Sequence, residues 1–146
     1  YLKEQLIKFR DSIRGEQKDY IPAHEMRAAV AELSEAEMDE VVAYIETWDV
    51  TPGATTVIGD TVRGAGLYAN CSACHGLSAT GNRALSAPAL VNRDDWYLRR
   101  QLKLFQSGYR GQHPEDIAGA QMRSAAQLLK SDEDINDVLA HIGTLN

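Results

Sequence analysis

The sequence has no long hydrophobic run, and no stretch approaches the roughly 20 apolar residues that a membrane-spanning helix needs. Its opening residues, YLKEQLIKFR, do not resemble a secretory signal, so the targeting segment of an exported protein would have been removed or would lie outside this sequence. Tracts of Lys and Arg are also missing. The 21 acidic residues outnumber the 15 basic ones, which argues against a nucleic-acid partner.

Charge is spread unevenly along the chain. Residues 1–50 contain six Lys and Arg and twelve Asp and Glu, whereas residues 51–146 contain nine of each. An acidic surface can steer a basic partner toward a protein, but a surface of this kind is more often simply solvated. We therefore expect the acidic N-terminal part to be mainly a solvated surface.

Cysteine is scarce: the only two are Cys71 and Cys74, and His75 follows the second directly. The spacing C-x-x-C alone fits a redox-active pair, half of a zinc site or a haem attachment site. A thioredoxin-like pair requires a preceding strand in a βαβ setting, and no strand pattern is visible. A zinc site requires further ligands, which the other three histidines do not offer because they are scattered.

His75 favours haem among these alternatives. Two thiols about one helical turn apart can add to the two vinyl groups of one porphyrin, and the next residue can place an imidazole nitrogen under the iron. The motif therefore predicts one covalently attached c-type haem, with its iron, held by Cys71, Cys74 and His75.

An internal repeat organises the rest of the chain. YLKEQLIKFRDSIRG at 1–15 matches YLRRQLKLFQSGYRG at 97–111 without a gap, and the register continues until one residue is inserted after Leu129. Only the second copy is preceded by the cysteine motif. We therefore predict a partial repeat without a haem motif (1–48), a linker (49–59) and a complete domain (60–146).

The periodicity of the sequence is helical throughout, so we predict an all-α fold. The expected elements include a short helix over 61–70, a loop over 76–94 and a helix whose start Asp94 or Asp95 can cap. Capping boxes are expected at Ser34 with Glu37 and at Ser131 with Asp134.

Electron transfer without binding of small molecules requires a second axial ligand on the iron. Thioether sulphur is a suitable one, since it favours Fe(II) and raises the reduction potential. Among Met26, Met38 and Met122, the last is the best candidate, because it follows His75 across a helix and a loop and the chain can return to the haem.

Residues 60–146 resemble a class I cytochrome c, and more closely the C-terminal domain of the dihaem, two-domain cytochromes of the c-four type. The resemblance lies in GAGLYANCSACHG, GNRALSAPAL, DWYLRRQLKLFQSGYRG, DIAGAQM and the terminal AHIGTL. It implies short helices wrapped around one haem, with Met122 as the sixth ligand and a Pro88 carbonyl that accepts from the His75 ring. It also implies that the first and last helices of the domain cross, with Gly66 allowing close approach and Tyr68 filling the crossing. The residues expected to wall the haem are Trp96, Tyr97, Leu98, Leu102 and Phe105, and Arg110 could pair with a propionate.

Residues 1–48 resemble the rear half of a second such domain. Without cysteine, this half-domain cannot hold a haem covalently. Either the chain is a piece of a longer dihaem protein, which we favour, or the half-domain is a haemless appendage. Its apolar residues, among them Leu33, Val41, Val42 and Ile45, are expected to pack on the haem domain or on another chain, which would give a homodimer.

The resemblance implies electron transfer without catalysis, in a bacterial periplasm and a respiratory chain, with a terminal oxidase or reductase among the redox partners. Two rival functions remain open. The first is a haem-based sensor or peroxidase-like enzyme with a labile sixth ligand. The second is an interaction module in which the haem only stabilises a surface formed with residues 1–48.

Overall fold

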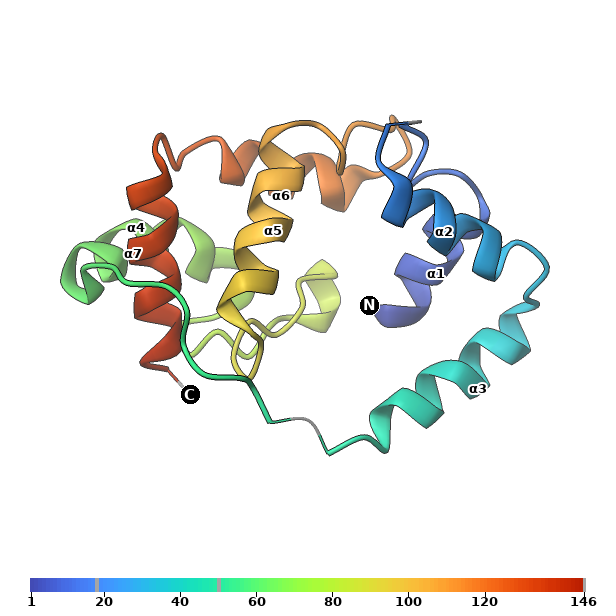
Figure 1. Cartoon of the computed structure of the whole chain (residues 1–146), viewed down its shortest axis with the longest axis horizontal. Coiled ribbons are helices and arrows are strands. Elements are labelled where there is room, and N and C mark those ends of the chain that lie inside the picture. Colours follow the sequence, from blue (N-terminus) through green and yellow to red (C-terminus); the bar gives the residue numbers. More distant parts are fainter. Residues whose placement is uncertain (18, 50, 146) are drawn as a thin grey trace.

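Seven α-helices account for most of the regular structure in the computed structural model, which describes residues 1–17, 19–49 and 51–145 (Figure 1). No strand occurs among these residues, so the predicted all-α fold is confirmed. Val50 of the predicted linker and Asn146 of the predicted domain lie outside the described residues. None of the described helices is both long and apolar enough to cross a lipid bilayer. The helices are α1 (Leu2–Arg10), α2 (Ile21–Val30), α3 (Glu35–Glu46), α4 (Thr61–His75), α5 (Asp95–Gln106), α6 (Ile117–Ala126) and α7 (Asp132–Gly143), with a short 3-10 helix, η1 (Arg83–Leu85), before α5.

The repeat of the sequence reappears in the helices. A shift of 96 residues carries the bounds of α2 onto those of α6, and a shift of 97 carries α3 onto α7, as the inserted residue requires. Helix α4 has no counterpart upstream. Helices α1–α3 pack around a small hydrophobic core that contains Phe9 and Met38. Helices α4, α5 and α7 pack around a larger one that contains Tyr68 and Ile135.

Helices α4 and α7 pack against each other and share the most extensive contact between any two of the described helices (Figure 1). Gly64 lies at their crossing, where an added Cβ would be 2.0 Å from the carbonyl oxygen of Asp137. A Cβ at Gly66 would meet nothing within 4 Å, so the prediction that Gly66 allows the close approach is wrong. Tyr68 fills the crossing as expected, with its ring centroid 5.4 Å from that of His141.

Both predicted capping boxes are confirmed, at the starts of α3 and α7. In α7 the Asp134 carboxylate accepts hydrogen bonds from the backbone N–H groups of Lys130 (2.6 Å) and Ser131 (3.2 Å), and it pairs with Arg63 of α4. The bond from Lys130, followed by those from Arg63 and Ser131, holds the pKa of Asp134 below its usual value, although burial opposes the shift.

Stability should therefore fall in acid. A carboxyl group with a lowered pKa in the folded state stabilises that state above its unfolded pKa of about 4, and the contribution is lost as the pH falls toward the lowered value. We expect the thermal unfolding midpoint to drop between about pH 5 and pH 3, and to drop less steeply in Asp134→Asn. Glu133→Gln on the same helical turn controls for the lost charge, and an equal flattening of its profile would contradict this assignment.

The predicted linker lies along the α4–α7 unit. Residues 51–59 contain no helix, and the Val57 side chain is buried in the larger core, while its N–H donates to Asp95 Oδ2 (2.9 Å). Asp94 occupies the N-cap position of α5 as predicted. Its side chain makes no capping bond, however, and instead accepts from the backbone N–H of Gly53 (2.7 Å). The two carboxylates thus fix the linker to the start of α5.

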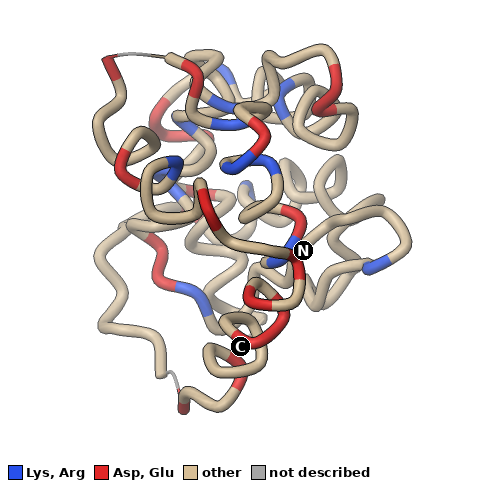
Figure 2. The backbone as a smooth tube through the Cα atoms, turned by 90° about the vertical axis from the view of Figure 1, so that its right-hand side faces the viewer, with Lys and Arg blue, Asp and Glu red and all other residues tan. Residues whose placement is uncertain are grey.

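Helix α3 leaves an apolar stripe uncovered. It packs on α1 through the buried Met38, whereas Val41 and Tyr44 of α3 are 37% and 66% exposed, and Trp48, just beyond its end, is 55% exposed. In α7 the equivalent face is covered by α4, which has no counterpart for α3. Of the two expected partners for Val41, the haem domain is therefore not the one observed, and packing on another chain stays a proposal. Figure 2 views the molecule from the side of α1–α3, where the acidic residues of the N-terminal part lie.

Candidate haem site

The C-x-x-C-H motif forms the last turn of α4, which Asp60 caps and which is longer than the predicted 61–70 helix. Helical geometry therefore holds the two thiols and the imidazole within about one turn. Cys71 is half-buried, Cys74 is exposed, and both are free thiols. Burial, with a smaller contribution from Cys74, raises the pKa of Cys71 to about 11, so this thiol is protonated at neutral pH.

The His75 ring is buried and fixed in orientation. His75 is only 6% exposed, and its Nδ1 is 2.8 Å from the carbonyl oxygen of Pro88. A carbonyl can only accept, so Nδ1 carries the proton and Nε2 keeps the free lone pair of a neutral ring. Burial lowers the pKa of His75, against the opposite effect of the Pro88 bond. The ring is thus held in the neutral form that binds metals.

The 76–94 loop folds back onto the end of α4 and so positions Pro88. The Gly81 N–H donates to the carbonyl oxygen of His75 (2.8 Å), and Ala79 is fully buried in the larger core. Gly81 has φ +85, and a Cβ there would lie 2.6 Å from the backbone nitrogen that follows Pro88. Glycine is therefore required at this position for the loop to approach itself closely.

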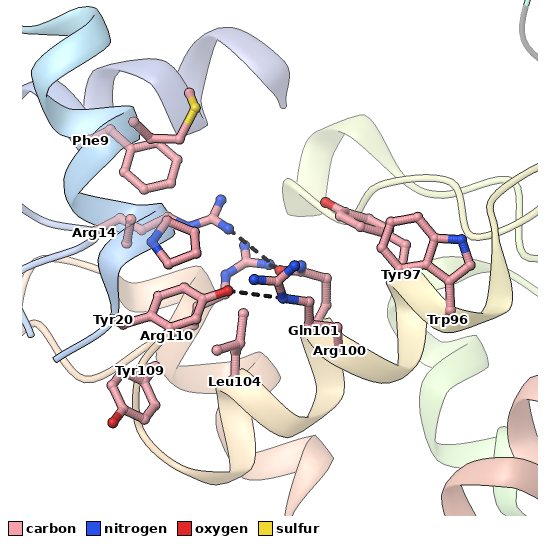
Figure 3. A pocket seen from close by; sticks show the side chains of 13 residues that line it. Phe9, Arg14, Tyr20, Trp96, Tyr97, Arg100, Gln101, Leu104, Tyr109 and Arg110 are labelled. Atoms are coloured by element: carbon pink, nitrogen blue, oxygen red, sulfur yellow. Dashed lines mark hydrogen bonds between the residues drawn. The ribbon is translucent and has the colours of Figure 1, made fainter.

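Helix α5 presents its predicted haem-facing residues in two directions. Leu98 is buried in the larger core, where Leu102 and Cys71 pack at the edge. Trp96 and Tyr97 are 51% and 39% exposed, and they line a cavity that faces α1 and α2 (Figure 3). The structure thus brings Leu98 and Leu102 together with the attachment helix, and it turns Trp96 and Tyr97 toward the N-terminal helices.

The three methionines lie in different surroundings. Met122 is half-buried in α6, which packs on α5. Met38 is fully buried in the smaller core, and Met26 is 37% exposed at the cavity beside α2. His113 lies in the loop before α6, where an imidazole would be the alternative axial ligand to the Met122 thioether, and its Nδ1 accepts from the backbone N–H of Glu115 (3.2 Å). The assignment of Met122 as the second axial ligand stays a proposal.

Arg110 belongs to a hydrogen-bonded network that the sequence reasoning missed. Its Nη1 donates to Gln101 Oε1 (2.5 Å), and its Nη2 donates to Gln5 Oε1 (3.1 Å) and to the Tyr1 hydroxyl (3.1 Å). The guanidinium lies over the Phe105 ring, 4.3 Å from its centroid. The repeat carried the signal, since Gln5 and Gln101 occupy equivalent positions.

The donor set fits a covalently bound c-type haem. It offers two free thiols and a neutral imidazole on one helical turn, with the ring held by a backbone carbonyl and apolar side chains next to Cys71. In the described part of the chain, no three or more His, Cys, Asp and Glu side chains gather as a metal ion would require, which counts against the zinc alternative.

Known proteins resemble this chain over most of its length. The thiosulfate dehydrogenase electron acceptor of Stutzerimonas stutzeri (strain A1501) is 30% identical over 130 residues, which are 82% of this chain and 56% of the relative. The chain therefore spans little more than half the length of that relative. A solved structure of cytochrome c4 from Acidithiobacillus ferrooxidans shares the fold, with a TM-score of 0.73 and 19% identity over 99% of this chain and 82% of that one. The family model for cytochrome c matches residues 61–146, which is more than half of the sequence and includes the whole C-x-x-C-H motif, and the chain therefore belongs to the cytochrome c family.

Proposed function

We propose that this chain is an electron carrier, without catalytic activity, that holds a single c-type haem through Cys71 and Cys74 with His75 and Met122 as axial ligands. The observation that carries the proposal is the position of His75, which ends α4 directly after the second thiol and has its ring fixed by the Pro88 carbonyl. Membership of the cytochrome c family supports haem-based electron transfer. When bound, a c-type haem supplies a reversible one-electron change at its iron.

The side chains of this protein hold and tune that group. The bond from His75 to Pro88 fixes the imidazole and raises the basicity of its other nitrogen. The thioether of Met122 favours the reduced iron and so raises the potential. Leu98 and Leu102 provide apolar surface beside the attachment helix, which limits access of water.

We assign the protein to a bacterial periplasm and a respiratory chain, where it would carry electrons toward a terminal oxidase or reductase. The relative named as a thiosulfate dehydrogenase electron acceptor supports a dehydrogenase as the donor. We also propose that a second copy of the chain covers the exposed stripe of α3, which light scattering would detect as a dimer.

Intact mass and a visible spectrum test the proposal on one sample. We expect the mass of the polypeptide plus one haem, a colour that does not extract into acidified solvent, and the far-red ferric band of sulfur–iron ligation. The double variant C71S/C74S should lose the covalent mass increment. Rapid binding of CO would favour the sensor or peroxidase-like alternative, and a polypeptide without haem would overturn the proposal.

A further inference from the structure

Four side chains form a nearly symmetrical ring where the two repeats meet. Gln5 and Arg14 of the first repeat are equivalent to Gln101 and Arg110 of the second. Gln5 Oε1 accepts from Arg14 Nη1 (2.7 Å) and from Arg110 Nη2 (3.1 Å). Gln101 Oε1 accepts from Arg110 Nη1 (2.5 Å) and from Arg14 Nη2 (3.4 Å). Each repeat thus contributes one arginine and one glutamine, and each arginine reaches across to the other repeat.

The ring joins two positive charges through neutral acceptors. Arg110 is only 8% exposed, and Arg14 lies over the Phe9 ring, 4.5 Å from its centroid. Burial, followed by the charge of Arg110, lowers the pKa of Arg14 to about 10. The Asp116 carboxylate partly offsets this shift, but it is already engaged by Lys8 at 2.6 Å. One buried and one half-buried cation thus lie together, and among the described residues no carboxylate forms an ion pair with either of them.

An open cavity of about 310 Å³ adjoins the ring (Figure 3). A third guanidinium, that of Arg100, lines it and donates from Nε to the Tyr20 hydroxyl (3.0 Å). The residues that line the cavity include Arg14, Arg100 and Arg110 together with the aromatic rings of Tyr20 and Tyr109, and none of them is Asp or Glu. In a protein with net charge −6, this concentration of unpaired positive charge is suited to an anion.

We propose that the cavity binds a carboxylate or another oxyanion between Arg14 and Arg110, so that both repeats contribute to one anion site. Planar guanidinium groups bind such groups with paired, charge-assisted hydrogen bonds. The anion has two possible sources: the propionate groups of the chain's own haem, which rests on the proposed function, or a free oxyanion from solution. In either case Arg14 gives residues 1–48 a direct part in binding.

The experiment compares the haem-loaded protein with Arg14→Gln, Arg14→Lys and Arg10→Gln. Arg10 pairs with Asp11 at the surface, so Arg10→Gln matches the charge change outside the cavity. Intact mass first reports the haem content of each variant, so that failure of haem attachment is distinguished from failure of the anion site. Two readouts follow: the reduction potential without added oxyanions, and the thermal unfolding midpoint in increasing phosphate at constant ionic strength.

If the anion is a haem propionate, the reduction potential should be lower in Arg14→Gln than in Arg10→Gln, because loss of a nearby positive charge favours the oxidised haem. In that case phosphate should have no saturable effect on the unfolding midpoint. A free oxyanion predicts a saturable rise of the wild-type midpoint and phosphate binding about tenfold or more weaker in Arg14→Gln. Arg14→Lys keeps the charge and should retain most of the potential but weaken phosphate binding. Equal potentials and equal phosphate responses in Arg14→Gln and Arg10→Gln would overturn the proposal.

Discussion

Replacing Gly64 with alanine should destabilise the folded protein by about 2–3 kcal/mol and lower its thermal unfolding midpoint by roughly 5–10 °C. The added Cβ would lie 2.0 Å from the carbonyl oxygen and 2.5 Å from the carbonyl carbon of Asp137. These are backbone atoms of α7, so the clash is relieved only if α4 and α7 move apart. That movement would loosen the core around Tyr68 and Ile135. Thermal or urea unfolding of the haem-loaded variant measures the effect.

Gly66→Ala provides a matched control on the same helix. A Cβ at Gly66 meets nothing within 4 Å, and alanine has the higher helix propensity, so this variant should be neutral or more stable by about 0.5–1 kcal/mol. The same chemical change two residues apart should therefore have opposite signs. Similar unfolding midpoints for the two variants would mean that α4 and α7 do not cross at Gly64.

The choice between these glycines shows where sequence reasoning succeeded and where it failed. The all-α fold, the two capping boxes and the loop after His75 follow from local patterns, and the structure contains them. The helix crossing depends on which face of α4 meets α7. Gly64 and Tyr68 are four residues apart and share a face, whereas Gly66 lies about half a turn away. Because Tyr68 was expected in the crossing, the same helical spacing already favoured Gly64 as the glycine of close approach. The prediction of Gly66 was therefore inconsistent with the prediction for Tyr68.

The candidate site divides in the same way. The attachment motif spans five consecutive residues, and Pro88 lies in the loop that directly follows it. Both are therefore close in sequence, and the structure brings the Pro88 carbonyl to the His75 ring. The ring of Arg14 and Arg110 depends on how two repeats dock, which no local pattern specifies. That the apolar residues of 1–48 need a partner was visible in the sequence, because this half has no counterpart of the helix that carries the cysteine motif; the structure adds which of them α3 leaves exposed. The resemblance to the cytochrome c family, in contrast, is confirmed by the match over 61–146.

Replacing Met122 with alanine should remove the far-red ferric band and lower the reduction potential by a substantial part of the roughly 0.8 V range that axial ligands govern. A thioether favours the reduced iron, and water or another oxygen or nitrogen donor in its place would favour the oxidised form. The variant should still carry covalent haem, since Cys71, Cys74 and His75 lie on α4 and are unchanged. Spectroscopy and potentiometric titration measure both effects, and intact mass reports the haem.

Met26→Ala is the matched control, because the repeat makes Met26 the equivalent of Met122 while its surroundings differ. Met26 is 37% exposed at the cavity between the repeats and has no C-x-x-C-H motif in its own half of the chain. Its replacement should leave the band and the potential close to those of the wild type. If Met122→Ala kept both, the ligand would have to come from elsewhere, and loss of the wild-type spectrum in His113→Ala would identify His113. Met26 and Met122 occupy equivalent positions in the two repeats, but only Met122 belongs to the repeat that has the C-x-x-C-H motif. The two variants therefore test whether that motif decides which methionine binds the iron.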